Sequence, residues 1–208
     1  MPPRASTDVQ PANQQRRITV LRLFAIAALP LILFTRSHWA EDTFPFEMME
    51  IIGILLVITA VLGRFWAILY IGAMKNRTVM DEGPYSVCRH PLYFFSTLGV
   101  VGFGMMLGSV TLAVTLGIVT FLILSATAAR EETFLRHEFG ATYDRYAARV
   151  PRILPNPALF HARPTVTSSI RALRVNFADA LVFLAFIPVA EVTEAVKSSG
   201  VLPSLPLW

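Results

Sequence analysis

Apolar residues in this chain gather in long runs separated by short polar segments. The runs cover residues 18–34, 48–71, 92–129 and 177–190. A helix that crosses the apolar core of a bilayer needs about 20 residues, so each of the first two runs predicts one membrane span. The first run is expected to be retained, because no small-x-small cleavage site follows it. The fourth run is near the lower limit for a span, and a re-entrant or packed helix is its alternative.

The third run is too long for one span and is interrupted only by Leu107-Gly108-Ser109. At about 1.5 Å per residue, two helices of about 16 and 20 residues would cross the membrane and return. Such a hairpin delivers the residues on its two sides to the same membrane face. We therefore expect Arg89 and His90, before the run, to lie close to Glu131 and Glu132, after it.

The segment 131–150 mixes polar and apolar positions. Its apolar stripe recurs at spacings of four and three, and consists of Leu135, Phe139, Tyr143, Tyr146 and Val150. This pattern predicts a helix lying at the membrane interface. Glu132 and Arg136 form a favourable i,i+4 pair, so a solvated surface role for Glu132 competes with a functional one.

Composition supports a membrane setting. The chain is 54% hydrophobic and 15% charged, with a mean hydropathy of +0.56, which is too apolar for an ordinary soluble domain. We expect an all-α fold: a polytopic membrane helix bundle with about four to five transmembrane helices and a cytoplasmic interfacial helix. Basic residues flank one side of the predicted spans, which places the N-terminus and the active site on the cytoplasmic side.

The net charge of +4 follows from this topology and from contact with anionic membrane lipids. No basic soluble module with stacking aromatics is visible, so nucleic-acid binding is not expected. His38, His137 and His161 are not paired at ligand spacing, and no Cys/His or carboxylate/His cluster indicates a metal site. We predict no metal.

Residues 83–93, GPYSVCRHPLY, concentrate ionisable and aromatic groups between two apolar runs. The stretch opens on Gly-Pro, a turn signal, and Pro91 suits the first position of a new helix, so a helix is expected to begin near His90. The unpaired N–H groups at that end, with Arg89 beside them, would hold a carboxylate or a phosphate. His90 and Tyr93, three residues apart, share one helix face.

The order of motifs resembles the isoprenylcysteine carboxyl methyltransferase family and the related phospholipid methyltransferases, over about residues 60–155. After GPYSVCRHPLY and a hairpin-length apolar run come Glu131-Glu132, Phe139-Gly140, Tyr143, Tyr146 and RVPRILP at 149–155. The resemblance implies that the RHPxY and EE elements form a cofactor site for S-adenosylmethionine. It assigns His90, Tyr93, Glu131 and Glu132 to that site.

S-adenosylmethionine carries a carboxylate, an ammonium, a sulfonium, a ribose and a flat purine, which chemically match these residues together with Tyr85 and Arg89. Methyl transfer to a carboxylate needs no general base, so the protein must align the two reactants and exclude water. An arginine that holds the carboxylate is then sufficient. Arg149 and Arg152 are the candidates, although gripping lipid phosphate is an alternative use for both. With Tyr146 they form the predicted catalytic set.

We therefore predict an S-adenosylmethionine-dependent membrane methyltransferase that acts on a carboxylate of a lipid-like or isoprenylcysteine-like small molecule. The expected organisation is a disordered tail (1–17), a membrane methyltransferase domain (18–155) and a C-terminal polar connection with a further apolar helix (156–208). One alternative is a phospholipid (ethanolamine) N-methyltransferase, in which Glu131 or His90 would remove an ammonium proton. Others are a steroid-reductase-like NADPH-dependent oxidoreductase and a non-enzymatic membrane subunit.

Overall fold

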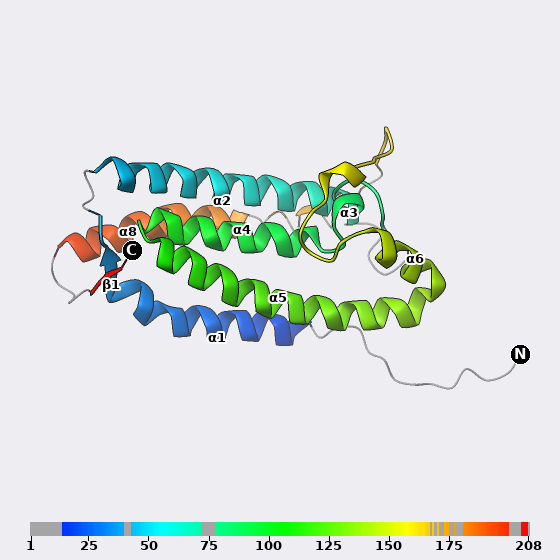
Figure 1. The fold of residues 1–208 in the computed structure, drawn as a ribbon, viewed down its shortest axis with the longest axis horizontal. Helices are drawn as coiled ribbons and strands as arrows, with labels where there is room; N and C mark the ends of the chain where they lie inside the picture. The colour runs from blue at the N-terminus through cyan, green and yellow to red at the C-terminus, as the bar shows by residue number, and fades with distance from the viewer. Residues whose placement is uncertain are drawn as a thin grey trace, which may run out of the picture.

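The structure is a computed structural model that describes residues 14–39, 43–71, 78–166, 181–199 and 205–207, with residues 168, 170, 173, 174 and 177. Long helices lie side by side in an elongated bundle (Figure 1): α1 (Gln14–Leu33), α2 (Phe44–Ile71), α4 (Pro91–Met106), α5 (Val110–Phe139) and α8 (Phe186–Ser198). Short elements lie at its ends: β1 (Thr35–Ser37), α3 (Pro84–Val87), α6 (Ala141–Arg149), η1 (Pro157–Leu159) and β2 (Leu205–Leu207). The short η2 (Val182–Ala185) leads into α8 beside the middle of α4, where Phe183 lies against Gly99. The predicted all-α class is confirmed.

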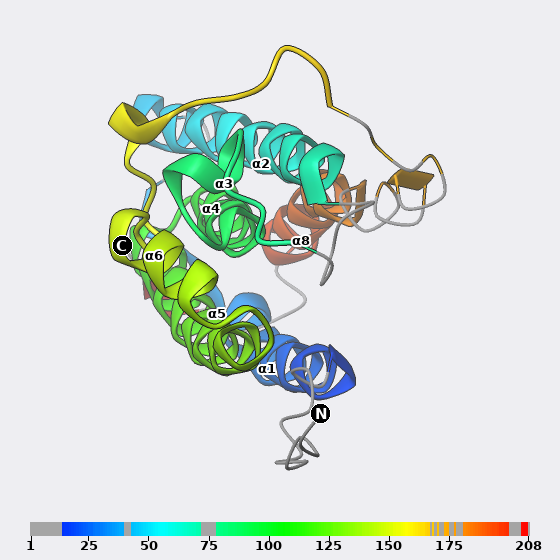
Figure 2. The same cartoon turned by 90° about the vertical axis from the view of Figure 1, so that its right-hand side faces the viewer.

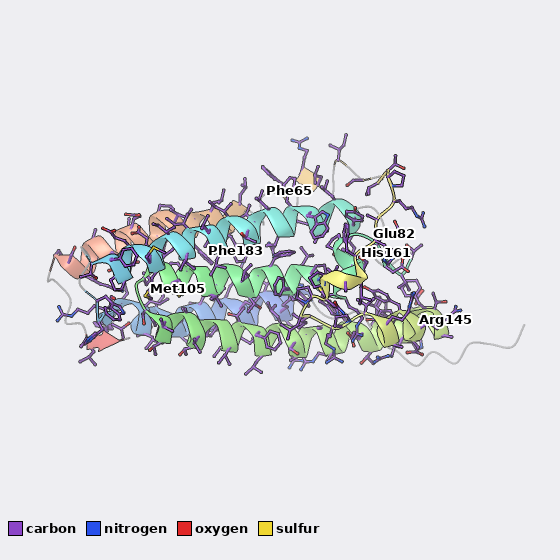
Figure 3. All side chains as sticks on the ribbon, turned by 45° about the horizontal axis from the view of Figure 1, so that its top comes forward. Phe65, Glu82, Met105, Arg145, His161 and Phe183 are labelled. Atoms are coloured by element: carbon purple, nitrogen blue, oxygen red, sulfur yellow. The ribbon has the colours of Figure 1, made fainter. Side chains whose placement is uncertain are left out.

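The two ends of the bundle differ in chemistry. Helices α1, α2, α4 and α5 run in alternating directions, so the start of α1, the start of α4 and the end of α5 share one end with α3 and α6 (Figure 1). We call this the motif end, and the opposite end, with β1, the sheet end. Figure 3 shows Glu82, His161 and Arg145 at the motif end and Met105 near the sheet end.

The helical hairpin predicted over residues 92–129 is present as α4 and α5. Pro91 is the first residue of α4, with His90 at its N-cap, as the Pro signal predicts. The chain turns at Gly108, whose φ of 63° favours glycine, and the Ser109 side chain accepts a hydrogen bond from the Leu112 backbone N–H at 3.2 Å. The two halves of the hairpin therefore bring the RHPxY and EE motifs to the motif end.

The boundaries predicted for an interfacial helix over residues 131–150 are wrong. Helix α5 has 30 residues and continues through Phe139, and only then does Gly140, at a φ of 51°, turn the chain into α6. The apolar part of α5 ends at Ala129, so Glu131 and Glu132 lie on the polar extension of the same helix, beyond the length of about 20 residues that spans a bilayer.

Close packing fixes α2 against α4. A Cβ atom placed on Gly53 of α2 would lie 2.6 Å from the Gly102 carbonyl oxygen of α4, so the two backbones approach too closely for a larger residue. Arg64, within the apolar α2, donates to the Ser96 hydroxyl, and its guanidinium lies 4.9 Å from the Phe183 ring centroid. The charge thus faces protein, which a bilayer setting requires.

Helices α2 and α5 are long and apolar enough to cross a membrane, whereas α4 is a shorter apolar helix of 16 residues. Both long helices carry large apolar side chains on their outer faces, among them Leu55 and Leu62 on α2 and Ile118 and Leu122 on α5. Outward-facing apolar stripes of this length match a lipid environment, because no other protein layer covers them in the described chain.

The two ends of the chain depart from the sequence-based expectation. The C-terminal strand β2 pairs with β1 in a parallel two-stranded sheet, with Thr35 opposite Leu205. The sequence does not predict this pairing, because both strands are short and show little alternation of apolar and polar residues. Residues 178–180 of the run 177–190 lie outside the described residues, η2 and α8 cover 182–190, and α8 extends beyond the run to Ser198. Residues 1–13 also lie outside them, and α1 begins at Gln14, inside the segment predicted as a tail.

Candidate functional site

Glu132 is the centre of a buried charge cluster at the motif end. Its side chain is 0% exposed, and Oε1 accepts a hydrogen bond from Arg89 Nε at 2.9 Å. Arg152 donates from Nε to Oε1 at 3.2 Å and from Nη2 to Oε2 at 3.0 Å, while His90 Nε2 lies 3.3 Å from Oε1. The alternative of a solvated surface pair between Glu132 and Arg136 is therefore wrong, and Arg136 instead contacts Asp144 at 3.1 Å.

Backbone pairing holds this cluster together. The Arg89 amide donates to the Pro151 carbonyl and the His90 amide to the Arg152 carbonyl, both at 2.9 Å. The Arg89 guanidinium also donates from Nη1 to the carbonyls of Ala147 and Val150. These hydrogen bonds hold the start of the segment 149–155 against residues 89–90. These bonds commit the Arg89 side chain and the amides of Arg89 and His90 within the protein.

The electrostatics of Glu132 follow from these contacts. Burial by itself would raise the pKa of the Glu132 carboxyl, but the close contact with His90 and the hydrogen bonds from Arg152 and Arg89 outweigh it and lower the pKa to about 2. The carboxylate therefore stays ionised throughout the physiological range. Because Arg89, Arg152 and His90 already surround the Glu132 carboxylate, its role is to hold these side chains in place.

Glu131 occupies a more open position beside the same motif. Its side chain is 29% exposed, its Oε2 lies 3.7 Å from His90 Nδ1, and its Oε1 lies 3.9 Å from Arg17 Nη1. The His90 and Tyr93 rings stack with centroids 5.3 Å apart and planes 4° apart, and the Tyr93 hydroxyl accepts a hydrogen bond from Arg17 at 3.0 Å. A partly exposed carboxylate thus lies next to a flat aromatic face.

Tyr85 and Tyr146 are joined within the protein. The Tyr146 hydroxyl donates to the Tyr85 carbonyl at 2.7 Å, and both side chains are buried. The Tyr85 hydroxyl is buried with no hydrogen-bond partner among the described residues. Burial raises the pKa of the Tyr85 hydroxyl, and the negative charge of Glu131 adds to this.

Arg149 is separated from the buried cluster. Its side chain is 67% exposed, and its nearest acidic group is Asp81, with Arg149 Nη2 and Asp81 Oδ2 3.9 Å apart. Arg152, by contrast, is bound to Glu132 although its side chain is 42% exposed. The two predicted acceptor-binding arginines therefore differ, because the ionic contact of Arg149 with Asp81 is long and exposed, whereas Arg152 forms a close pair with the buried Glu132.

Two contacts escaped the sequence reasoning. Arg17 appears in the sequence only as a basic flank of the first apolar run, yet it reaches Tyr93 on α4 and Glu131 on α5. Tyr143 is also buried beside the cluster; burial raises the pKa of its hydroxyl, and the charge of Glu132 adds to this. The sequence feature that could have indicated this role for Arg17 is its position in the first turn of a helix that starts at the motif end.

An apolar cavity of about 400 Å³ lies directly behind the RHPxY motif. It is lined by Trp66, Pro84, Val87, Cys88, Pro91, Phe94, Phe95, Pro155, Pro157 and Phe160. Burial raises the pKa of the Cys88 thiol to about 12, against a weaker opposing effect of a backbone hydrogen bond from His90, so Cys88 is a neutral wall residue. No group of three or more His, Cys, Asp or Glu side chains in the described segments is arranged to hold a metal ion.

Comparisons with known proteins agree with these motifs. Residues 48–142 match the family model described as phospholipid methyltransferase. The cobalt-zinc-cadmium resistance protein CzcN of Cupriavidus metallidurans is 34% identical over 188 residues, which cover 90% of this chain and 86% of CzcN. The nickel-cobalt-cadmium resistance protein NccN of Alcaligenes xylosoxydans xylosoxydans is 33% identical over 193 residues, which cover 93% of this chain and 90% of NccN.

Protein-S-isoprenylcysteine O-methyltransferase B of Arabidopsis thaliana is 31% identical over 123 residues, covering 58% of this chain and 62% of that protein. This chain belongs to the isoprenylcysteine carboxyl methyltransferase and phospholipid methyltransferase-like family. The predicted family is thereby confirmed. Membership and the two long apolar helices make this chain an integral membrane protein. No solved structure matches it significantly.

Proposed function

We propose that the protein is an S-adenosylmethionine-dependent membrane methyltransferase that transfers a methyl group to the carboxylate of a lipid-like small molecule. One observation carries the proposal. The buried Glu132 carboxylate binds Arg89 of the RHPxY motif and Arg152 of RVPRILP, and Glu132 itself belongs to the EE motif. Three motifs far apart in the chain thus meet at one point, as a shared site requires.

The residues around Glu131 fit the cofactor. The buried Tyr85 hydroxyl without a partner, the partly exposed Glu131 carboxylate and the flat stack of His90 and Tyr93 offer a hydrogen-bond donor, a negative charge and an aromatic face. These complement a ribose hydroxyl, an ammonium and a purine, respectively. Bound S-adenosylmethionine would supply the electrophilic methyl group.

The two neighbouring glutamates take different roles in this proposal. Glu132 is already matched by two arginines and a histidine, so it acts as a positioning residue for Arg89 and His90. Glu131 has weaker contacts at 3.7 and 3.9 Å, and it is the carboxylate that binds the ammonium group. Arg17 and Tyr93 then border the same site.

The acceptor carboxylate is held by Arg149 in this proposal. A carboxylate is anionic at neutral pH, so the protein has to orient it in line with the methyl group and exclude water. Arg149 is exposed and only loosely paired with Asp81, whereas Arg152 is bound to Glu132. The apolar cavity behind the motif would take the acceptor's hydrocarbon part, because it shares Cys88 and Pro91 with the motif segment.

The proposed topology follows the direction of the helices. Helices α1, α2, α4 and α5 would cross the membrane with the motif end in the cytoplasm, whereas α8, at 13 residues, is too short to cross it. Arg16, Arg17, Arg130, Arg136, Arg145 and Arg149 support this orientation, since they lie on helix segments that belong to the motif end. The cofactor then enters from water and the acceptor from the bilayer.

Isothermal titration of the detergent-purified full-length protein tests the cofactor. S-adenosylmethionine should bind, and NADPH should not. Glu131→Gln should weaken S-adenosylmethionine binding by about 10- to 100-fold, since it removes a charge-assisted hydrogen bond of about 1.5–3 kcal/mol. Glu138→Gln is the matched control, because Glu138 is an exposed residue of the same helix. Binding of NADPH alone, or equal effects of both variants, would contradict the proposal.

The acceptor is tested by kinetics with membrane extracts as substrate. Arg149→Ala should raise the acceptor KM or lower kcat and leave S-adenosylmethionine affinity unchanged, and Arg149→Lys should rescue little because it lacks the planar fork. Arg145→Ala, an exposed arginine on the same helix, should have no effect. Carboxylate methylation should be nearly flat from about pH 6 to 8, well above a carboxyl pKa of about 4. A steep rise with pH in an active Arg149→Ala enzyme would indicate an amine acceptor instead.

A role in metal resistance is a second candidate, favoured by the names of CzcN and NccN, which align over most of this chain. In one case the protein acts in metal resistance through its methyltransferase activity, and in the other it does so without any such activity. Growth of a deletion strain on cobalt, zinc and cadmium, complemented with the wild type or with Glu131→Gln, separates the two cases. Complementation by both proteins would indicate a non-enzymatic membrane role, whereas complementation by the wild type alone would tie resistance to the cofactor site.

A further inference from the structure

A second cavity, of about 300 Å³, lies between α1 and α5 at the motif end. Figures 1 and 2 both show these two helices side by side. Three arginines line it, Arg16 and Arg17 from α1 and Arg130 from α5. Its remaining lining residues are Val20, Ile123, Ala126 and Thr127, so no acidic side chain lines the cavity.

The charge of this cavity favours an anion. Arg17 contacts the Tyr93 hydroxyl and lies 3.9 Å from Glu131, which is not among the residues that line the cavity. Arg130 makes no salt bridge within the segments that the structure describes. Three guanidinium groups around one cavity repel one another, and a phosphate between them would replace this repulsion with charge-assisted hydrogen bonds.

The cavity continues into an apolar surface. On α5, Ile118, Leu122, Ala126 and Arg130 follow one another at intervals of four and therefore share one helix face. Ile118 is 54% and Leu122 60% exposed, and on α1 Val20 and Leu23 are exposed as well. A ligand that fills the cavity therefore meets cationic groups at one end and apolar side chains at the other, which is the chemistry of a phospholipid.

We infer that this cavity binds the phosphate of an anionic phospholipid, with Arg16, Arg17 and Arg130 around the headgroup and the acyl chains along the exposed stripe of α5. Basic cavities between helices at the cytoplasmic interface suit such headgroups. Arg17 touches both this lipid and Tyr93, so lipid binding is coupled to the RHPxY motif. The inference stands independently of the proposed enzymatic activity.

Native mass spectrometry of the delipidated full-length protein tests this. Dioleoyl phosphatidylglycerol should bind, and dioleoyl phosphatidylcholine, which is zwitterionic, should bind at least several-fold more weakly. Arg130→Gln should lower phosphatidylglycerol affinity about tenfold through the loss of one charge-assisted contact. Arg145→Gln removes an exposed arginine from α6 at the same end and should leave lipid binding unchanged.

A second pair of variants removes space while every charge is kept. Ala126→Leu fills the cavity and should abolish retention of phosphatidylglycerol, whereas Ala129→Leu, an exposed position of α5 outside the lining, should not. Inorganic phosphate in millimolar excess should fail to displace the lipid, since it lacks the acyl chains. Displacement by phosphate would overturn the lipid assignment in favour of a soluble anion, and equal phosphatidylglycerol binding by wild type, Arg130→Gln and Ala126→Leu would overturn the site.

Discussion

Replacing Glu132 by glutamine should destabilise the fold strongly. The Glu132 carboxylate is fully buried and accepts three hydrogen bonds from Arg89 and Arg152. Glutamine keeps the shape but removes the charge, and it leaves the 9% exposed Arg89 side chain without its counter-ion. Removing one partner of a buried ion pair costs about 3–5 kcal/mol.

The acidity of Glu132 gives a second route to this magnitude. Its pKa falls from 4.5 to about 2 on folding, which corresponds to about 3 kcal/mol in favour of the folded anion. Because the folded-state pKa is depressed, this stabilisation is fully present above about pH 5 and is lost as the pH falls from about 4.5 to about 2. The two routes agree on a loss of about 3 kcal/mol for Glu132→Gln at pH 7.

Unfolding in mixed detergent micelles, followed by tryptophan fluorescence as sodium dodecyl sulfate is titrated, measures this loss. Wild type and Glu132→Gln should differ by about 3 kcal/mol at pH 7 and should converge as the pH falls to about 2, where the wild-type carboxyl protonates in the folded state. Glu138→Gln, exposed on the same helix, should stay within about 0.5 kcal/mol of wild type. If Glu132→Gln and Glu138→Gln had the same small effect, the charge cluster would have no role in stability.

Two further predictions concern topology and Tyr146. In a Cys88→Ser background, a membrane-impermeant thiol reagent added from outside should label Val110→Cys at the sheet end and miss Asp81→Cys at the motif end; the reverse pattern would contradict the orientation. Tyr146→Phe should cost about 1–3 kcal/mol of stability, since it leaves the Tyr85 carbonyl unsatisfied, with kcat nearly unchanged in the folded fraction; a large fall in kcat at unchanged stability would restore the predicted catalytic role.

The helical hairpin could be predicted because its signals are local. Pro91 can begin a helix without losing a hydrogen bond, and Leu107-Gly108-Ser109 is the only break in a long apolar run. A chain that crosses and returns must bring the two flanks together, so the proximity of His90 to Glu131 and Glu132 also follows from length alone.

The assignment of roles within the site could not be predicted in the same way. Glu131 and Glu132 point about 100° apart on a helix, and which of them is buried depends on the segment 149–155, which contributes Arg152 from another part of the chain. Local spacing favoured the pair of Glu132 with Arg136, but Arg136 contacts Asp144 because α6 folds back after Gly140. Sequence spacing does not encode such tertiary contacts.

The burial of Glu132 also sets the position of Glu131. Since the two residues are adjacent on one helix, fixing Glu132 against Arg89 and Arg152 directs Glu131 toward His90 and Arg17. Two variants separate the structural role of Glu132 from the cofactor-binding role of Glu131. Glu131→Gln should weaken S-adenosylmethionine binding while the unfolding free energy stays near that of wild type, because its contacts are long and partly exposed. Glu132→Gln should lower the unfolding free energy and, by releasing Glu131 from its position, weaken cofactor binding as well. If Glu132→Gln lost cofactor affinity with full stability, Glu132 would contact the cofactor directly, and the division of roles between the two glutamates would be wrong.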